Sequence, residues 1–194
     1  MNGIVIIPVH NPDITLIGLV EQIWNYGNQV IIVDDGSEKK CNEIFEQAEN
    51  MAIVLHHQEK RGKGEAIKTG LSYIEKELWD CDAVGVMDAA GKYHAEDIER
   101  LVMKAKQRKM TLFIGVQEEK WNIRIKNRIA KQLFQISSGI HLWDTYFGLW
   151  AFDIRLIPKL IQVKGKIPIE EVKLKATRKR KANVFGKKSN AMQL

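Results

Sequence analysis

The sequence predicts an α/β fold with a mostly parallel central sheet and helices on both faces of that sheet. Two observations support this prediction. Short apolar runs alternate with segments of helical spacing over the first 116 residues, which is typical of strands joined by right-handed crossover helices. Several of these runs end in acidic or polar residues, and open parallel sheets bind ligands beyond the carboxyl ends of their strands. The 194 residues of the chain suit one such domain.

Five short apolar runs are predicted as strands because of their length and their turn-forming neighbours. They are residues 3–9, 29–37, 51–57, 82–88 and 111–116. Between these runs, apolar residues recur at helical spacing. Ile67, Leu71 and Ile74, for example, fall on one face of a helix. Helices are therefore predicted at residues 12–26, 38–50, 62–79 and 95–108.

The regular alternation fades after Val116, and the remaining segments differ from one another in character. We expect a basic amphipathic helix at residues 121–138 and an aromatic-rich loop around Gly148 at residues 143–153. A short helix is expected at residues 154–162 and a strand-like segment at residues 166–176. The sequence contains no internal repeat and no sign of a second domain. We therefore expect one domain over residues 1–176, followed by a basic tail at residues 177–194.

The net charge of +6 is concentrated at the C-terminal end of the chain. Residues 166–194 hold nine basic and two acidic residues, a net charge of +7, so the rest of the chain is close to neutral. Such a cluster attracts phosphates, nucleic acid or an anionic membrane face; the alternative is a solvated, partly disordered end. Because Phe185 is the only aromatic residue of the tail, we expect no nucleic acid partner.

A cytoplasmic location is expected from features that the sequence lacks. No apolar run approaches the roughly 20 residues that span a bilayer, and no basic region precedes the N-terminal apolar run. Cys41 and Cys81 give neither a disulfide framework nor a metal-ligand spacing. The basic tail adds the expectation of peripheral binding at the inner face of the membrane.

The motif "VDDGS" at residues 33–37 places two acids and a turn glycine after a strand. A carboxylate in this position can accept hydrogen bonds from the edge of a nucleobase or from a ribose hydroxyl. Alternatively, Asp35 or Ser37 could cap the N-terminus of the following helix. Both interpretations stay open on this motif alone.

The glycine-rich segment "EKRGKGEAIKTG" at residues 59–70 lies before a predicted helix. Gly62 and Gly64 would let backbone N–H groups approach a phosphate at the helix start, and Lys63 could add charge. The spacing is not that of a P-loop, because no Ser or Thr follows Lys63. The segment is therefore a weak signal when taken alone.

Asp88 ends the fourth predicted strand and is followed by two alanines and a glycine. Hard divalent cations such as Mg²⁺ or Mn²⁺ take carboxylate oxygens and bridge to substrate phosphates. Alternatively, Asp88 could cap the helix that begins near Ala95. The histidines show no metal-ligand spacing, which holds for His56, His57, His94 and His141.

Together, these motifs resemble one enzyme family. The segments "IIPVHNPD", "VIIVDDGS", "RGKGEAIKTGL", "VMDAAG" and "DTYFGLWAF" follow one another in this order. The order resembles that of the family 2 glycosyltransferases, which have the GT-A fold. It is most similar to the branch that contains dolichol-phosphate mannosyltransferases and bacterial polyprenyl-phosphate glycosyltransferases. The resemblance covers residues 3–175.

The resemblance implies an inverting enzyme that uses a UDP- or GDP-sugar, Mg²⁺ or Mn²⁺, and a lipid-phosphate (polyprenyl-phosphate), glycan or other cell-envelope acceptor. The nucleotide-binding residues that it implies are Pro8, His10, Asp34, Asp35 and Lys63. It also implies that Asp88 is a catalytic residue and the first acid of the metal-binding Asp-x-Asp motif. Asp144 would be a catalytic residue of the acceptor-side loop, and contacts to phosphate or acceptor would come from Arg124 and Arg128.

The sequence departs from the family pattern at the metal motif. Ala90 stands where the pattern has its second acid, and Lys92 puts a cation nearby. Loss of one carboxylate and repulsion from a lysine both oppose metal binding. We therefore expect a weakened metal site and low or no transferase activity.

Other departures affect the acceptor side. The acceptor loop carries Tyr146, Phe147 and Trp150 in place of Gln, Thr and Arg, and an acidic helix of the family is missing, which shortens the domain near residues 165–166. One alternative is therefore a catalytically dead pseudoenzyme that binds a nucleotide or a partner. Another is a nucleotidyltransferase on a related sheet, although no glycine-rich loop follows the first strand.

Overall fold

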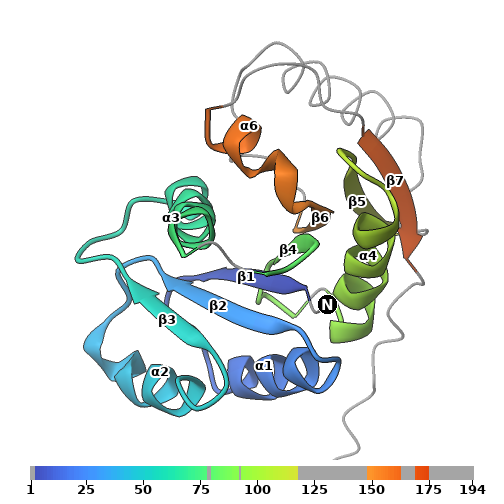
Figure 1. The fold of residues 1–194 in the computed structure, drawn as a ribbon. Helices are drawn as coiled ribbons and strands as arrows, with labels where there is room; N and C mark the ends of the chain where they lie inside the picture. Colours follow the sequence, from blue (N-terminus) through green and yellow to red (C-terminus); the bar gives the residue numbers. More distant parts are fainter. Residues whose placement is uncertain (1–2, 78–79, 92, 118–147, 163–168, 175–194) are drawn as a thin grey trace, which may run out of the picture.

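The computed structural model describes residues 3–77, 80–91, 93–117, 148–162 and 169–174. These residues form a seven-stranded sheet with the order β3-β2-β1-β4-β6-β5-β7 (Figure 1). The strands are β1 (Ile4–Val9), β2 (Gln29–Asp34), β3 (Ile53–His56), β4 (Ala83–Met87), β5 (Leu112–Gln117), β6 (Leu149–Asp153) and β7 (Ile169–Leu174). Paired strands run parallel except where β6 pairs with β4 and β5. The predicted α/β class and mostly parallel sheet are confirmed.

Helices cover both faces of the sheet, as Figure 1 shows. They are α1 (Thr15–Asn25), α2 (Asn42–Ala48), α3 (Lys63–Lys76), α4 (Ala95–Gln107) and α6 (Ile157–Gln162), with the 3₁₀ turns η1 (Lys39–Cys41) and η3 (Ile154–Leu156). Buried side chains of α1, α2 and α4 form one core with the sheet, and those of α3 and α6 form the other. This three-layer arrangement is the one that the alternating sequence pattern predicts.

Strand β1 supplies side chains to both cores, which explains its unbroken apolar sequence. All six of its residues are buried. Val5 and Ile7 belong to the core with α1 and α4, whereas Ile4 and Ile6 belong to the core with α3. Full burial of an aliphatic side chain of this size contributes about 1.5–3 kcal/mol. The strand that carries the start of the site is therefore firmly held from both sides.

The predicted loop at residues 143–153 is wrong for its second half. Residues 149–153 form β6, which lies between β4 and β5, and all five are buried. Trp150 and Phe152 belong to one core and stack with their ring centroids 5.4 Å apart. Leu149 and Ala151 belong to the other core. This period-two alternation is the pattern of a strand, and it outweighs the turn-forming tendency of the neighbouring glycine.

Other predictions concern residues that the structure does not describe. They are the helix at 121–138, the first part of the aromatic-rich loop, the shortening near 165–166 and the tail at 177–194. The division of the chain into a domain and a tail therefore stays a prediction. Within the described ranges, no helix combines the length and the apolar character needed to cross a membrane.

Candidate functional site

The carboxyl ends of β1, β2 and β4 meet at one edge of the sheet because β1 pairs in parallel with both of the other strands. Two adjoining depressions of about 250 and 240 Å³ open at this edge. Both are lined by Pro8, Val9, His10 and Asp88. The second is also lined by Asp35, Lys60 and Lys63. Five of the predicted site residues, Pro8, His10, Asp35, Lys63 and Asp88, thus surround one shared hollow.

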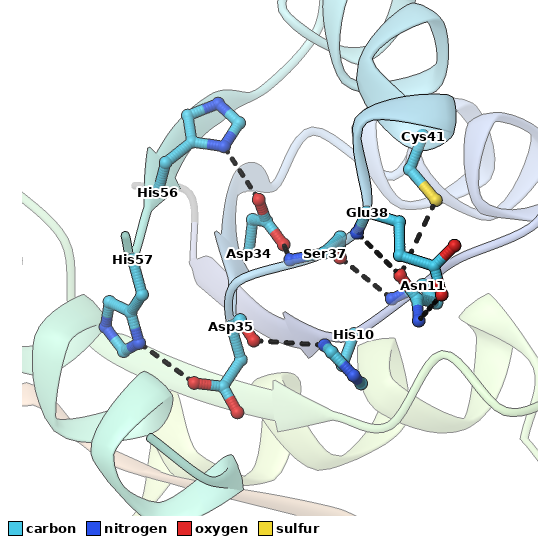
Figure 2. A network of polar contacts seen from close by, with 9 residues as sticks. All are labelled: His10, Asn11, Asp34, Asp35, Ser37, Glu38, Cys41, His56 and His57. Atoms are coloured by element: carbon cyan, nitrogen blue, oxygen red, sulfur yellow. Dashed lines mark hydrogen bonds and ion pairs between the residues drawn. The ribbon is translucent and has the colours of Figure 1, made fainter. Parts of the chain in front are cut away.

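Asp35 forms hydrogen bonds with several parts of the site, and Figure 2 shows those to His10 and His57. Its carboxylate accepts hydrogen bonds from the backbone N–H groups of Arg61 and Gly62, each at 2.8 Å, and from Nδ1 of His57 at 2.9 Å. Its backbone carbonyl accepts a bond from Nδ1 of His10 at 3.0 Å, so this nitrogen carries the proton. Asp35 therefore fixes the chain that leads into α3.

The environment of Asp35 favours its charged form. Burial raises the pKa of its carboxyl, but the hydrogen bonds from Arg61, His57 and Gly62 outweigh this effect. The pKa consequently lies below its ordinary value. Residue Asp35 is only 4% exposed, and its carboxylate is nevertheless ionised at neutral pH.

Asp34 has a different role from its neighbour. One carboxylate oxygen accepts the backbone N–H of Ser37 at 2.9 Å, which closes the turn after β2. The other oxygen lies 2.9 Å from Nδ1 of His56 on β3. Asp34, rather than Asp35 or Ser37, therefore holds the turn. Its carboxylate is engaged in these structural contacts, and the predicted nucleotide contact of Asp34 is untested.

Gly36 allows the turn after β2 and the loop before α3 to lie against each other. Its φ of +69° is in the left-handed region. A Cβ atom at this position would lie 2.5 Å from the carbonyl carbon of Glu59 and from the nitrogen of Lys60. The two backbones approach so closely that a side chain cannot fit between them. Gly36 is thus needed to keep Lys60 at the second depression.

Asn11 is a structural residue of the site that the sequence interpretation missed. Its φ of +52° is left-handed, a conformation in which Asn is enriched. Its backbone N–H donates to Ser37 Oγ at 2.8 Å, and its side-chain oxygen accepts the N–H of Glu38 at 2.8 Å (Figure 2). Asn11 therefore ties the end of β1 to the turn after β2. An Asn before a Pro at a strand end was the available signal.

Sequence interpretation also left His57 without a role. Its side chain is 5% exposed, and its Nε2 lies 2.9 Å from the hydroxyl of Thr69 on α3 while Nδ1 bonds to Asp35. Because an ionised carboxylate can only accept, Nδ1 donates and Thr69 donates to Nε2 when the ring is neutral. His57 therefore orients the carboxylate of Asp35 and links β3 to α3.

Asp88 lies at the opposite side of the shared hollow and is paired with a lysine. Nζ of Lys63 is 3.1 Å from its Oδ2, and the two side chains are 34% and 32% exposed. The helix α4 begins without Asp88, because Asp97 accepts the backbone N–H of His94 at 3.0 Å. The interpretation of Asp88 as a cap of that helix is therefore wrong. Its carboxylate faces the hollow instead.

The described residues around Asp88 are not grouped as a set of metal ligands. Asp88 offers one carboxylate, which is paired with Lys63, and Ala90 offers none. Among the residues that the structure describes, no three His, Cys, Asp or Glu side chains are grouped in a way that could hold a metal ion. Mg²⁺ and Mn²⁺ prefer several oxygen ligands. The donor set present here does not fit a tightly bound cation.

Tyr93 and Gly148 pack directly behind Asp88. The backbone N–H of Asp88 donates to the carbonyl of Gly148 at 2.7 Å. A Cβ atom on Gly148 would lie 2.6 Å from the ring of Tyr93 and 3.3 Å from Cβ of Asp88. Burial and the nearby Asp88 charge raise the pKa of the Tyr93 hydroxyl. The chain that enters β6 therefore supports the backbone that carries Asp88.

Three predicted site residues, Asp144, Arg124 and Arg128, lie outside the described residues. The structure therefore does not test their predicted roles.

Comparisons with solved structures agree with the fold. Glucosyl-3-phosphoglycerate synthase from Mycobacterium tuberculosis, in complex with Mn²⁺, UDP and phosphoglyceric acid, superposes with a TM-score of 0.62 and 17% identity, over 90% of this chain and 69% of that chain. The mannosyltransferase PcManGT from Pyrobaculum calidifontis, in complex with GDP-Man and Mn²⁺, gives a TM-score of 0.54 and 18% identity, over 82% of this chain and 46% of that chain. At such identities these likenesses show a shared fold.

Comparisons of sequence identify the family. Glycosyltransferase GlyG from Streptococcus pneumoniae serotype 4 (strain ATCC BAA-334 / TIGR4) is 29% identical over 117 residues, which are 57% of this chain and 37% of that protein. The chain thus spans little more than a third of this relative's length. The model of the glycosyl transferase family 2 matches residues 4–160, well over half of the chain. The chain therefore belongs to glycosyl transferase family 2.

Proposed function

We propose that the chain is an inverting glycosyltransferase that moves a sugar from a UDP- or GDP-sugar to a polyprenyl-phosphate or glycan acceptor of the cell envelope. The observation that carries this proposal is the hollow where β1, β2, α3 and β4 bring Pro8, His10, Asp35, Lys63 and Asp88 together. Family 2 membership and the UDP and GDP-Man complexes of its structural neighbours support the choice of donor.

The residues of the hollow suggest which part of the donor lies where. The nucleoside would lie against Pro8, His10 and the backbone around Asp35, a surface that combines an apolar ring with an imidazole. Lys63 would meet the negative diphosphate. Asp88 would face the sugar. Because Asp88 is the single carboxylate of its motif, a divalent cation such as Mg²⁺ or Mn²⁺ would bind there weakly.

The reaction is a single displacement at the anomeric carbon. An acceptor oxygen forms a bond to that carbon while the bond to the diphosphate oxygen breaks, and the electron pair leaves with the nucleoside diphosphate. A phosphate acceptor attacks as the anion, whereas a glycan hydroxyl would give its proton to Asp144. Asp144 is the proposed acceptor-side carboxylate, and Arg124 and Arg128 are proposed to contact phosphate. A cation next to the leaving diphosphate stabilises the charge that develops there, and Lys63 is positioned to do so.

The lipid-phosphate acceptor is proposed on the basis of the basic C-terminal segment. Its cations would hold the domain at the inner face of a membrane, each contributing about 1 kcal/mol near an anionic surface; they are Lys173, Lys175, Arg178, Lys179, Arg180, Lys181, Lys187 and Lys188. Co-sedimentation with anionic liposomes checks this. We expect the 194-residue chain to bind and a chain lacking residues 177–194 to remain unbound; equal binding would contradict the membrane role.

A second candidate function is favoured by one observation, the absence of a carboxylate at position 90. With an incomplete metal motif, the same hollow could bind a nucleotide without transferring its sugar. Such a pseudoenzyme would keep the nucleoside side of the site and lose the metal side.

A transfer assay distinguishes the two functions. Purified protein is incubated with radiolabelled UDP- and GDP-sugars and polyprenyl phosphate in detergent, and the labelled lipid is extracted. We expect slow transfer by the native chain and a loss of at least about 100-fold in Asp88→Ala. Glu75→Ala, a change on the surface of α3, is the matched control. Nucleotide binding without any transfer would support the pseudoenzyme.

A further inference from the structure

The loop between β3 and α3 brings lysines to the place where the family pattern has a metal ion. Nζ of Lys63 lies 3.1 Å from Oδ2 of Asp88, and Asp88 is the carboxylate that would hold a cation at this motif. Lys60, which is exposed, lines the same depression. Both ammonium groups are thus available on the side of the hollow where a diphosphate would lie.

The pairing of Lys63 with Asp88 competes with any divalent cation. Such a cation would have to displace an ammonium group that already neutralises the carboxylate, and like charges at this distance repel. It would not find the second acid of the family motif, because position 90 is an exposed alanine in the adjoining depression. The ammonium group of Lys63, which belongs to the chain itself, already lies beside the carboxylate of Asp88.

Two backbone donors of the loop are already occupied by Asp35. The N–H groups of Arg61 and Gly62 precede the helix start and could bind an anion, but both donate to the carboxylate of Asp35 at 2.8 Å. These two N–H groups therefore take no part in recognition of a diphosphate while they hold Asp35. The same two hydrogen bonds fix the backbone immediately before Lys63, so its position is set by the fold and not by the ligand.

Lys63 is also the first residue of a 14-residue helix. The N-terminal end of such a helix carries positive partial charge, which adds to the potential of the ammonium group at an anion. Since the lysine side chain is one-third exposed, it can turn from Asp88 to a bound diphosphate without unburying apolar surface.

We propose that the diphosphate of the nucleotide is bound by the ammonium group of Lys63, with Lys60 beside it, in place of a divalent cation. This inference rests on the proposed function, because it concerns the same nucleotide site. It adds that nucleotide binding needs no metal ion, because the positive charge of Lys63 replaces that of the metal.

Calorimetric titration of UDP and GDP tests the proposal, with one buffer containing excess EDTA and the other Mn²⁺. We expect the dissociation constants of the native chain to agree within about threefold between the two buffers. Lys63→Met is expected to weaken binding in EDTA by about tenfold or more, whereas Lys63→Arg retains most of the affinity. Lys68→Met, on the same helix and paired with Glu65 at 2.6 Å, is the matched control and leaves affinity unchanged.

The outcomes separate this inference from the proposed function. Binding of the native chain that requires Mn²⁺ would overturn the inference and leave the sugar-nucleotide function standing. Equal affinity of Lys63→Met and native protein in EDTA would also overturn it. Absence of binding in both buffers would overturn the inference and the proposed function together. A thermal melt of each variant establishes that it is folded before titration.

Discussion

The two sides of the candidate site are built in different ways. On the side of β2 and β3, Asp34 and Asp35 are 6% and 4% exposed, and each carboxylate accepts hydrogen bonds from the backbone and from a histidine. On the side of β4, Asp88 is about one-third exposed and is held by one lysine. The first side is fixed by several buried bonds, and the second by a single pair in contact with solvent.

This difference teaches which residues can change without loss of the fold. A buried acceptor that loses its donors costs about 1–3 kcal/mol, whereas an exposed ion pair contributes at most about 1 kcal/mol. The family pattern is kept on the rigid side and altered on the solvent-exposed side, at Ala90. The side of β2 and β3 is thus coupled to folding, while the β4 side can vary at less cost in stability.

The strongest way to break the rigid side is Gly36→Ala. Its Cβ would lie 2.5 Å from two backbone atoms at a φ of +69°, so the loop before α3 must move. We expect unfolding free energy to fall by about 3 kcal/mol in urea titrations. Gly91→Ala is the matched control, because Gly91 has the same φ of +69° but no neighbour within 4 Å. It isolates backbone strain, about 1 kcal/mol; equal losses would show that the close approach is unimportant.

Asp35→Asn compared with Asp88→Asn sharpens the contrast directly. At position 35, an asparagine side chain has one acceptor oxygen for three donors and turns an NH₂ group toward another N–H. We therefore expect the free energy of unfolding to fall by about 2 kcal/mol. At position 88, the same substitution gives up one solvent-exposed ion pair, and we expect a change within about 0.5 kcal/mol. Chemical denaturation of both variants measures the two values. Similar losses would mean that the two sides are equally coupled to folding.

Sequence interpretation succeeded where the pattern is local. The strands and helices around residues 3–117 follow from apolar spacing, and "VDDGS" was correctly located at a strand end of the site. Strand β6 was missed because its aromatic residues beside Gly148 were interpreted as a loop, although Trp150 and Phe152 alternate with Leu149 and Ala151 in burial. Local spacing was therefore sufficient for the fold except where composition was given more weight than periodicity.

The partners within the site could not be derived from sequence. Lys63 and Asp88 are 25 residues apart, and only the parallel pairing of β1 with β4 and the packing of α3 on the sheet bring them together. Likewise, the two adjacent acids have different partners because Asp34 is opposite His56 in the β2–β3 register, whereas Asp35 lies one residue beyond the strand. Tertiary register, which no short motif encodes, decides these roles.

A smaller effect is expected from Gly148→Ala, which tests the support of the solvent-exposed side. The new methyl group would meet the Tyr93 ring at 2.6 Å and Cβ of Asp88 at 3.3 Å. Because the partly buried ring of Tyr93 can shift, we expect the free energy of unfolding to fall by only about 1–2 kcal/mol. Gly18→Ala on α1, where no atom lies within 4 Å, should instead be neutral or stabilising by up to about 1 kcal/mol. Replacing Tyr93 by Leu as well should recover part of the loss; no recovery would locate the clash elsewhere.

The smallest predicted effect concerns pH and applies to the rigid side. Hydrogen bonds from Arg61, His57 and Gly62 outweigh the effect of burial and hold the pKa of Asp35 below its ordinary value of 3.8. A depressed folded-state pKa means that this stabilisation is complete above about pH 4 and is lost as pH falls through the folded-state pKa. The difference in unfolding free energy between native protein and Asp35→Asn should therefore narrow as the pH falls below about 4.

The pKa of Asp153 is also lowered, but its effect on stability is the same in both proteins and cancels in this comparison. Burial raises the pKa of Asp153, but hydrogen bonds from Arg155 and Met110 outweigh it and lower that pKa. Asp153 is present in both proteins, so the difference between their curves belongs to position 35. Curves that stay parallel down to about pH 2 would mean that the Asp35 bonds survive protonation. The charge on that carboxylate would then not be what fixes the loop before Lys63, and the rigid side would owe its stability to the shape of the turn at Gly36.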